Sequence, residues 1–128
     1  MVTRSLELVR DPAAASIARS WLVDVLRAPA VLSGPAQADL LVMASELVAN
    51  VMAHTQSDLR LTISCDDDEV RIAVTDDDPG EPTMQEVGAD RVGGNGLRIV
   101  DAWSRSWGIE RRANHGKTVW FTVATTPA

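Results

Sequence analysis

The order of apolar patterns along the 128 residues predicts an α+β domain, in which one sheet is covered on one face by three helices. Segments with apolar residues at steps of three and four predict helices, and segments in which apolar and polar residues alternate predict strands. Clusters of glycine, proline and aspartate separate these segments. The resulting order is strand, helix, helix, strand, strand, loop, helix, strand, strand. The length predicts a single domain over residues 1–128 with one two-layer core.

The first half of the chain contains the two longest predicted helices. A weakly alternating strand over Ser5–Val9 precedes a helix whose expected N-cap is Asp11, with Pro12 at its first position. After a break at residues 33–35, the stretch 40–55 (LLVMASELVANVMAHT) has the apolar period of a long helix. We expect the rest of the chain to be organised around this helix.

The second half of the chain supplies four further strands and one helix. The strands are predicted at Leu59–Cys65, Val70–Val74, Trp107–Glu110 and Lys117–Val123. The helix follows a polar loop over 81–91 and is opened by the glycine turn at 93–96. The acidic run Asp66–Glu69 lacks the spaced aspartates and later glutamate of a calcium loop, so a solvated hairpin turn is the better interpretation.

Composition limits the classes of function. The net charge is −6, with 18 acidic and 12 basic residues, so direct binding to nucleic acid is not expected, although five basic residues between Arg98 and Lys117 leave room for a local positive patch. The single cysteine, Cys65, cannot form an internal disulfide and fits a reducing compartment as a small apolar strand residue. We see neither an apolar run of about 18 residues nor a signal peptide, and expect a cytoplasmic protein without a membrane segment.

Three polar residues lie four apart in the long helix. Glu46, Asn50 and His54 advance about 40° per step, so they line one flank beside the apolar face. Glu46 could act as a general base for a hydroxyl or water, and the neutral oxygen of Asn50 suits Mg²⁺. A solvated polar flank is the alternative interpretation, and His54 could simply interact with the helix dipole.

Two later segments carry chemistry of the same kind. Gly94-x-Gly96 at a helix start lets the backbone approach an anion, although tight turns use the same residues. It is not a P-loop, because no Gly-Lys-Ser/Thr follows. Asp76 follows the apolar residues of a strand, where a carboxylate can accept a hydrogen bond from the exocyclic amine of a base. A turn-forming aspartate before proline is the alternative.

Together these segments resemble the GHKL (Bergerat) ATP-binding family, shared by gyrase-type ATPases, histidine kinases and anti-sigma serine kinases. The resemblance covers roughly residues 36–123 and is greatest to the anti-sigma regulatory branch. It implies the Bergerat fold, a two-layer α/β sandwich with a mostly antiparallel mixed sheet. The matching segments are 46–50 (ELVAN, the N box), 76–80 (DDDPG, the D-x-G-x-G box), 94–97 (GNGL, the G-x-G-L box) and 116–121 (GKTVWF, the closing G-x-T strand).

The resemblance also implies roles for individual residues. Asn50 would bind Mg²⁺, Asp76 would bind the adenine amino group, and Glu46 would activate a serine hydroxyl on a partner protein. Gly80 and the loop 81–93 would form a lid over the phosphates. The full set of implied nucleotide contacts is Asn50, His54, Asp76, Asp78, Gly80, Gly94, Asn95, Gly96, Leu97 and Thr118.

Two residues depart from the family pattern. Asp78 stands where the wider family has glycine, which adds a negative charge near the expected nucleotide. His54 stands where larger members have asparagine or aspartate.

The resemblance implies further contacts with the nucleotide. Thr118 would lie near the adenine, and Gly94 and Gly96 would let backbone N–H groups contact the phosphates.

The resemblance predicts a cytoplasmic serine/threonine kinase that binds Mg·ATP and phosphorylates a small anti-anti-sigma (STAS-type) protein. It would hold a sigma factor while that antagonist is phosphorylated. The alternative is a non-catalytic module in which ATP sets the affinity for a protein partner. A histidine kinase ranks third, because no dimerisation and phospho-acceptor helices precede the domain. A homodimer through the first helix and the sheet edge is a further option, for which Trp21 or Leu22 would be exposed.

Overall fold

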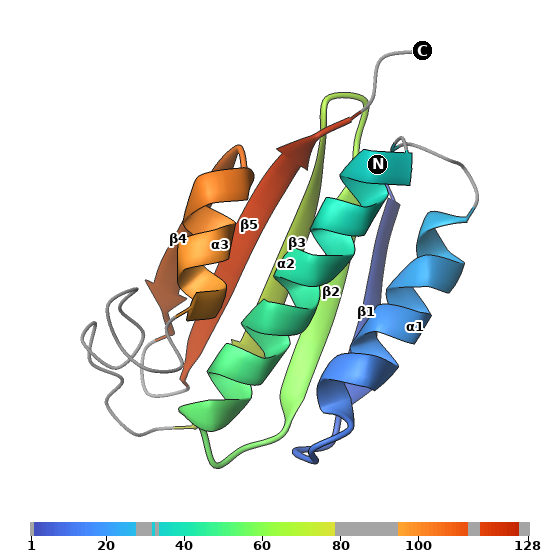
Figure 1. The fold of residues 1–128 in the computed structure, drawn as a ribbon. Coiled ribbons are helices and arrows are strands. Elements are labelled where there is room, and N and C mark those ends of the chain that lie inside the picture. The colour runs from blue at the N-terminus through green and yellow to red at the C-terminus, as the bar shows by residue number, and fades with distance from the viewer. Residues whose placement is uncertain (1, 28–31, 33, 79–94, 113–115, 126–128) are drawn as a thin grey trace.

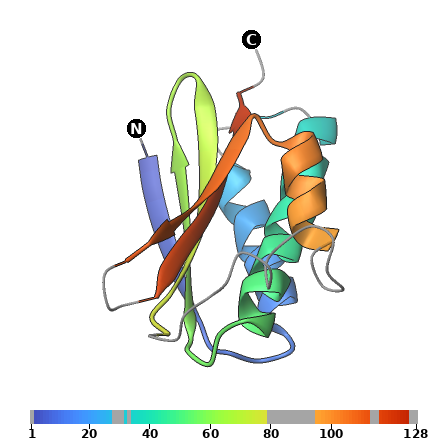
Figure 2. The ribbon, with the colours of Figure 1, turned by 90° about the vertical axis from the view of Figure 1, so that its left-hand side faces the viewer.

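The protein folds as a five-stranded sheet with three helices on one of its faces (Figures 1 and 2). The computed structural model describes residues 2–27, 32, 34–78, 95–112 and 116–125. Every predicted helix and strand is present in the predicted order. The elements are β1 (Val2–Leu8), α1 (Ala14–Leu26), α2 (Gly34–Ala53), β2 (Leu59–Cys65), β3 (Glu69–Asp76), α3 (Asn95–Trp103), β4 (Ser106–Arg111) and β5 (Lys117–Ala124).

The sheet is antiparallel between all of its neighbouring strands. The strand order is β1-β2-β3-β5-β4, so β5 lies between β3 and β4. The four pairings all run antiparallel, which differs from the mostly antiparallel mixed sheet that the resemblance implies. Registers such as Ile72 opposite Phe121 place apolar side chains of neighbouring strands on the same face.

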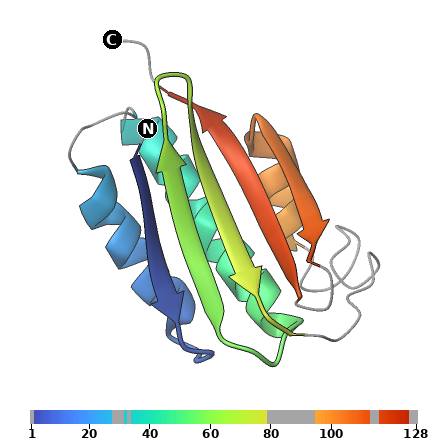
Figure 3. The ribbon, with the colours of Figure 1, turned by 180° about the vertical axis from the view of Figure 1, so that it is seen from behind.

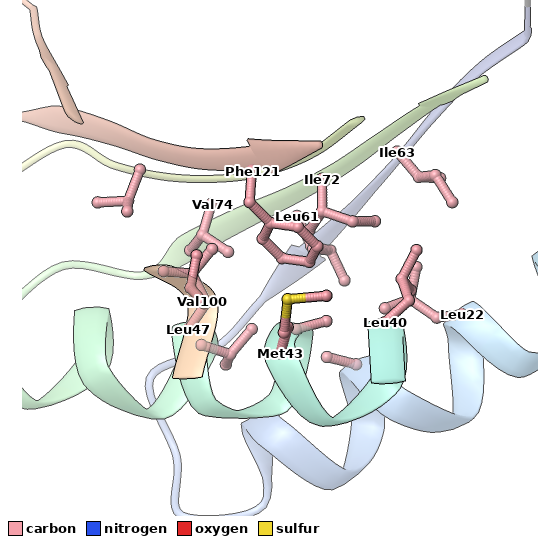
Figure 4. Close-up of a cluster of buried hydrophobic side chains, with 14 of the residues drawn as sticks. Leu22, Leu40, Met43, Leu47, Leu61, Ile63, Ile72, Val74, Val100 and Phe121 are labelled. Carbon is pink, nitrogen blue, oxygen red and sulfur yellow. The ribbon is translucent and has the colours of Figure 1, made fainter. Parts of the chain in front are cut away.

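The core lies between the sheet and the helices. Helix α2 packs between α1 and α3 and lies over the sheet, roughly along the direction of its strands (Figure 1). Its apolar side chains meet those of the central strands, as Met43 and Phe121 do in Figure 4. Removal of these groups from water is the main favourable term in folding. The largest fully buried apolar side chains are Leu22, Leu40, Met43, Leu47, Leu59, Leu61, Ile63, Ile72, Leu97 and Phe121.

Helix α2 is long and apolar enough to cross a membrane, which differs from the sequence expectation that no such segment exists. Among the described helices it alone passes this test, with a mean hydropathy of 1.2 over an 18-residue window. In the structure it is the central core helix, and 44% of that window is buried inside the protein. Core helices routinely pass the same test, so this is a weak indication of a membrane segment.

The first helix differs from its prediction in two respects. The helix begins at Ala14, and Asp11 forms a turn before it, because its Oδ1 accepts a hydrogen bond from the Ala13 N–H at 2.8 Å. Asp11 is therefore not the N-cap, and Pro12 precedes the helix instead of occupying its first position. Leu22 is fully buried and Trp21 packs against the core, so exposure of Leu22 in a dimer interface is wrong.

The face of the sheet opposite the helices is polar. Figure 3 shows this face, on which the described part of the chain places no helix. Hydroxyl groups pair across neighbouring strands, and Arg71 lies over the ring of Trp120 at 5.2 Å from its centroid. A polar surface of this kind needs no second covering layer. The hydroxyl pairs are Thr3–Ser64, Ser5–Thr62, Thr75–Thr118 and Ser106–Thr122.

The basic residues late in the chain do not form one surface patch. Lys117 is buried, Arg105 lies 3.8 Å from Glu69, and Arg112 lies 2.9 Å from Asp77. Nearby carboxylates thus offset two of the five charges and burial removes a third from the surface. The structure gives no support to a nucleic-acid interface there.

The hairpin between β2 and β3 has the turn that its acidic sequence predicts. Asp66 Oδ1 accepts hydrogen bonds from the N–H groups of Asp68 and Glu69, at 2.7 and 2.8 Å. These two bonds stabilise the carboxylate and lower the pKa of Asp66. The run therefore acts as a turn rather than a calcium loop.

We predict that substitution of Leu40 by alanine lowers the free energy of unfolding by about 2–5 kcal/mol, because Leu40 is fully buried and the change leaves a cavity. Val42→Ala on the same helix is the matched control, since Val42 is exposed, and its effect should stay within about 0.5 kcal/mol. Urea titration followed by circular dichroism measures both. Equal losses of unfolding free energy in the two variants would contradict the placement of the Leu40 side of α2 in the core.

We also predict that Cys65 alkylates at a higher pH in the folded protein than in the unfolded chain. Burial, and to a smaller degree the charge of Asp66, raises the pKa of the Cys65 thiol, so the reactive thiolate forms at a higher pH than in free cysteine. The measurement is the rate of iodoacetamide labelling against pH. The chain unfolded in urea is the control. If the labelling rate has its midpoint at the same pH in the folded and the unfolded chain, the prediction is refuted.

Candidate functional site

Four elements bring their ends together at one end of the molecule. Helix α2 ends at Ala53 and β3 ends at Asp76, while α3 begins at Asn95 and β5 begins at Lys117. Figures 1 and 2 show these four ends on the same side of the fold. The antiparallel pairing of β3 with β5 requires the end of one strand to lie beside the start of the other. Most of the sequence-predicted site residues lie at this end.

The polar flank of α2 is not uniformly solvated. Asn50 is buried with 4% of its surface exposed, whereas Glu46 is partly exposed one turn earlier. His54 follows the last residue of the helix and is also partly exposed. Burial of a side-chain amide has a cost unless it has partners, so the position of Asn50 indicates more than a solubilising residue.

Asp76 and Lys117 form a buried ion pair at the end of the sheet. The Lys117 Nζ lies 2.9 Å from Asp76 Oδ2, and the side chains are 2% and 1% exposed. Asp76 Oδ1 accepts a second hydrogen bond, from the backbone N–H of Asp78 at 3.0 Å. Removal of one partner from a buried pair typically costs about 3–5 kcal/mol, because the other charge is left uncompensated.

Gly116 allows the chain to approach Asp76 closely. Its φ is +88°, a conformation that residues with a Cβ rarely adopt. A Cβ at this position would clash with the carbonyl oxygen and Oδ1 of Asp76. The glycine of the predicted G-x-T strand therefore positions Lys117, the next residue, beside the aspartate.

The structure places Thr118 differently from the sequence prediction. Its hydroxyl bonds with that of Thr75 at 2.9 Å, on the open face of the sheet. Side chains alternate along a strand, so Lys117 and Val119 point to the opposite face, where the helices and Asp76 lie. Lys117 was not among the predicted site residues. The alternation with Val119 and Phe121 is the signal that could have assigned it to the inner face.

The carboxylate of Asp78 binds the loop between α2 and β2. Its Oδ2 accepts a hydrogen bond from the Gln56 N–H at 2.7 Å and one from the Thr55 hydroxyl at 3.3 Å. Thr55 is itself buried. Hydrogen bonds to an ionised acceptor are stronger than neutral ones, so this contact fixes the end of β3 to the end of α2. The added charge at Asp78 thus has a structural partner.

The same loop is bound from the other side by Arg10. The Arg10 Nε donates to the Thr55 carbonyl at 2.8 Å, and the Arg10 N–H donates to Asp58 Oδ1 at 2.9 Å. The Asp77 N–H donates to the Ser57 hydroxyl at 3.0 Å. The sequence patterns predicted no role for this loop, and the signal that could have found it is its run of Thr, Gln, Ser and Asp.

The remaining predicted site residues belong to the segment between β3 and α3 and to the start of α3. Gly80, Gly94 and the loop 81–93 lie outside the described residues. Asn95 and Gly96 form the first turn of α3, whose first backbone N–H groups have no acceptor within the helix. Leu97 is a core residue and anchors this turn to the apolar interior.

A metal ion at this site would depend on few protein ligands. The described residues contain no group of three or more His, Cys, Asp or Glu side chains that could hold a metal. Mg²⁺ is usually held by one or two protein oxygens together with phosphate and water, so Asn50 alone is compatible with it. A structural zinc or calcium site is not indicated by these residues.

Comparison with protein families identifies the class of domain. The model of the histidine kinase-like ATPase domain matches residues 8–123, nearly the whole chain. The chain therefore belongs to the histidine kinase-like ATPase domain family, and the resemblance to the GHKL class is confirmed. No curated protein matches.

A solved structure shows the same fold. The chain is similar to the crystal structure of the RsbU and RsbW domains of Rv1364c from Mycobacterium tuberculosis, with a TM-score of 0.73 and 21% sequence identity. The similarity covers 100% of this chain and 34% of that one. This chain thus spans about a third of its neighbour's length. At this level of identity, the similarity shows a shared fold.

We predict that Asp78→Ala lowers the free energy of unfolding by about 1–3 kcal/mol, because the Gln56 N–H and the Thr55 hydroxyl lose their shared acceptor. Asp77→Ala is the matched control. It removes an exposed ion pair with Arg112, which is worth about 0–1 kcal/mol. Thermal unfolding measures both variants, and a larger loss in the control would contradict the role of Asp78.

Proposed function

We propose that the chain binds Mg·ATP at the end of the fold where Asp76, Asn50 and the start of α3 lie. The observation that carries this proposal is the buried carboxylate of Asp76, set at the end of a strand in a chain of the ATPase-domain family. A carboxylate in that position can accept a hydrogen bond from the exocyclic amine of adenine. Residues 1–128 would form one nucleotide-binding domain.

The other groups complement a triphosphate. The free N–H groups in the first turn of α3, together with Gly94 and Gly96, would donate to phosphate oxygens at the positive end of the helix dipole. Asn50 would hold Mg²⁺, which supplies charge neutralisation on the phosphates when bound. The segment 81–93 with Gly80 would cover the phosphates.

Glu46 is the proposed general base. It lies one helical turn before Asn50 and is partly exposed, so a hydroxyl of a bound protein could reach it. Phosphoryl transfer depends mainly on positioning and charge neutralisation, so a base, a metal ligand and backbone donors form a sufficient set. The activity would be that of a serine/threonine kinase.

The proposed substrate is a STAS-type anti-anti-sigma protein in the cytoplasm, and a sigma factor is the second proposed partner. Both follow from the sequence resemblance to the anti-sigma regulatory branch. The net charge of −6 favours protein partners over nucleic acid. Partner binding would then regulate transcription without contact between this chain and DNA.

A non-catalytic switch is the second candidate. Asp76, the last residue of β3, is bonded to β5, and Asp78, two residues further on, is bonded to the α2–β2 loop. A nucleotide bound at Asp76 would therefore bias the positions of several elements at once, which is the requirement for a ligand-controlled partner surface.

We predict that Glu46→Gln lowers the rate of phosphate transfer to the partner by about 10²- to 10⁴-fold, while ATP affinity changes little, because the general base is lost and the binding groups remain. The measurement is transfer of label from γ-labelled ATP to a STAS-type protein. Asp39→Asn, an exposed change near the start of α2, is the matched control.

Two outcomes separate the candidates. Bound nucleotide without any labelled partner would reject the kinase. Control of the partner that survives Glu46→Gln and is lost in Asp76→Asn would favour the switch.

A further inference from the structure

The buried ammonium of Lys117 has fewer hydrogen bonds than it can make. An ammonium carries three N–H donors, and in the described part of the chain Lys117 has one partner, Asp76 Oδ2 at 2.9 Å. Only 2% of the side chain is exposed, so bulk water does not satisfy the remaining donors. A buried donor without an acceptor is costly, which indicates that a further acceptor belongs beside Lys117.

Asp76 likewise retains capacity to accept. An ionised carboxylate offers about four lone-pair sites, and the described contacts are the Lys117 ammonium on Oδ2 and the Asp78 N–H on Oδ1. The pair therefore presents an acceptor and a donor side by side on the helix-covered face of the sheet. Gly116 holds them there by its close approach to Asp76.

We infer that Lys117 is a second base-reading residue, which donates a hydrogen bond to N1 of adenine while Asp76 accepts one from the 6-amino group. This inference rests on the proposed binding of ATP. The edge of adenine that carries the 6-amino group and N1 presents a donor next to an acceptor, which complements the Asp76–Lys117 pair. Lys117 would thus determine specificity without taking part in phosphate transfer.

The same pair disfavours guanine in this position. Guanine carries O6, an acceptor, in place of the amino group, and N1–H, a donor, in place of N1. O6 would face the Asp76 carboxylate and N1–H would face the ammonium, so two attractive contacts become two repulsive ones. Mismatched polar groups in a buried site discriminate strongly between substrates.

The first test uses the unaltered protein and isothermal titration with ATP, 1-deaza-ATP and GTP, each with Mg²⁺. In 1-deaza-ATP a C–H replaces N1, so one charge-assisted hydrogen bond is lost. We expect it to bind roughly 10- to 100-fold more weakly than ATP, and GTP to bind more weakly still. Equal affinity for ATP and 1-deaza-ATP would overturn the inference.

The second test uses Lys117→Met, which keeps the length of the side chain and removes its charge. We expect this variant to bind ATP and 1-deaza-ATP equally. Arg112→Met is the matched control, since it removes an exposed charge from the same hairpin and should preserve the preference for ATP. If Lys117→Met does not fold, the titration of the unaltered protein still decides.

A third readout reports on the contact itself. ATP labelled with ¹⁵N at N1 should show an upfield shift of that nitrogen on binding, because N1 accepts a hydrogen bond, and the shift should be absent with Lys117→Met. A purely structural role of Lys117 would leave the N1 signal of bound ATP the same in both proteins.

Other outcomes identify a different role. Tighter ATP binding by Lys117→Met, with the ATP to 1-deaza-ATP ratio unchanged, would show that Lys117 competes with the amino group for Asp76 and would overturn the inference. Absence of binding by any adenine nucleotide would overturn the proposed function, and this inference with it. Equal binding of ATP and its deaza analogue overturns the inference alone.

Discussion

The burial of α2 between the sheet and the two other helices is the interaction on which the rest of the structure depends. One side of this helix is buried: its Leu40, Met43 and Leu47 side chains are removed from water and pack against side chains of β2, β3 and β5. Because a rigid helix fixes all of its residues once one face is packed, the same burial positions Asn50 and Glu46 at the margin of the core. Packing and chemistry are thus set by one element.

The part of the site that the sheet contributes depends on an ion pair. Asp76 and Lys117 are both buried, and each charge is tolerated because the other lies 2.9 Å away. Gly116 permits this approach, and Asp78 joins the end of β3 to the loop that follows α2. The family pattern has glycine at both positions. Gly116 keeps it and leaves space for the close approach, whereas Asp78 stands in place of a glycine and forms hydrogen bonds instead.

The order of all eight elements could be predicted, because periodicity of 2 or 3.6 residues is a local property of the chain. Local rules failed where a competing local hydrogen bond or a tertiary contact decided the outcome. Asp11 has the chemistry of an N-cap, yet its carboxylate binds Ala13 in a preceding turn. Leu22 belongs to a surface helix, yet the sheet and α2 bury it completely. The apolar length of α2 satisfied the criterion for a membrane span because a central core helix is apolar on most sides.

The sequence by itself determined the class of fold and the identity of the chemical groups, because both depend on residue type and short spacing. Only the tertiary structure decided how these groups meet. Asp76 and Lys117 are 41 residues apart, and Asp78 and Thr55 are 23 apart, so their hydrogen bonds depend on strand register and on the ends of elements that pack together. The choice of Lys117 over Thr118 as the neighbour of Asp76 follows from which face of β5 the helices cover, and this is a property of the folded sheet.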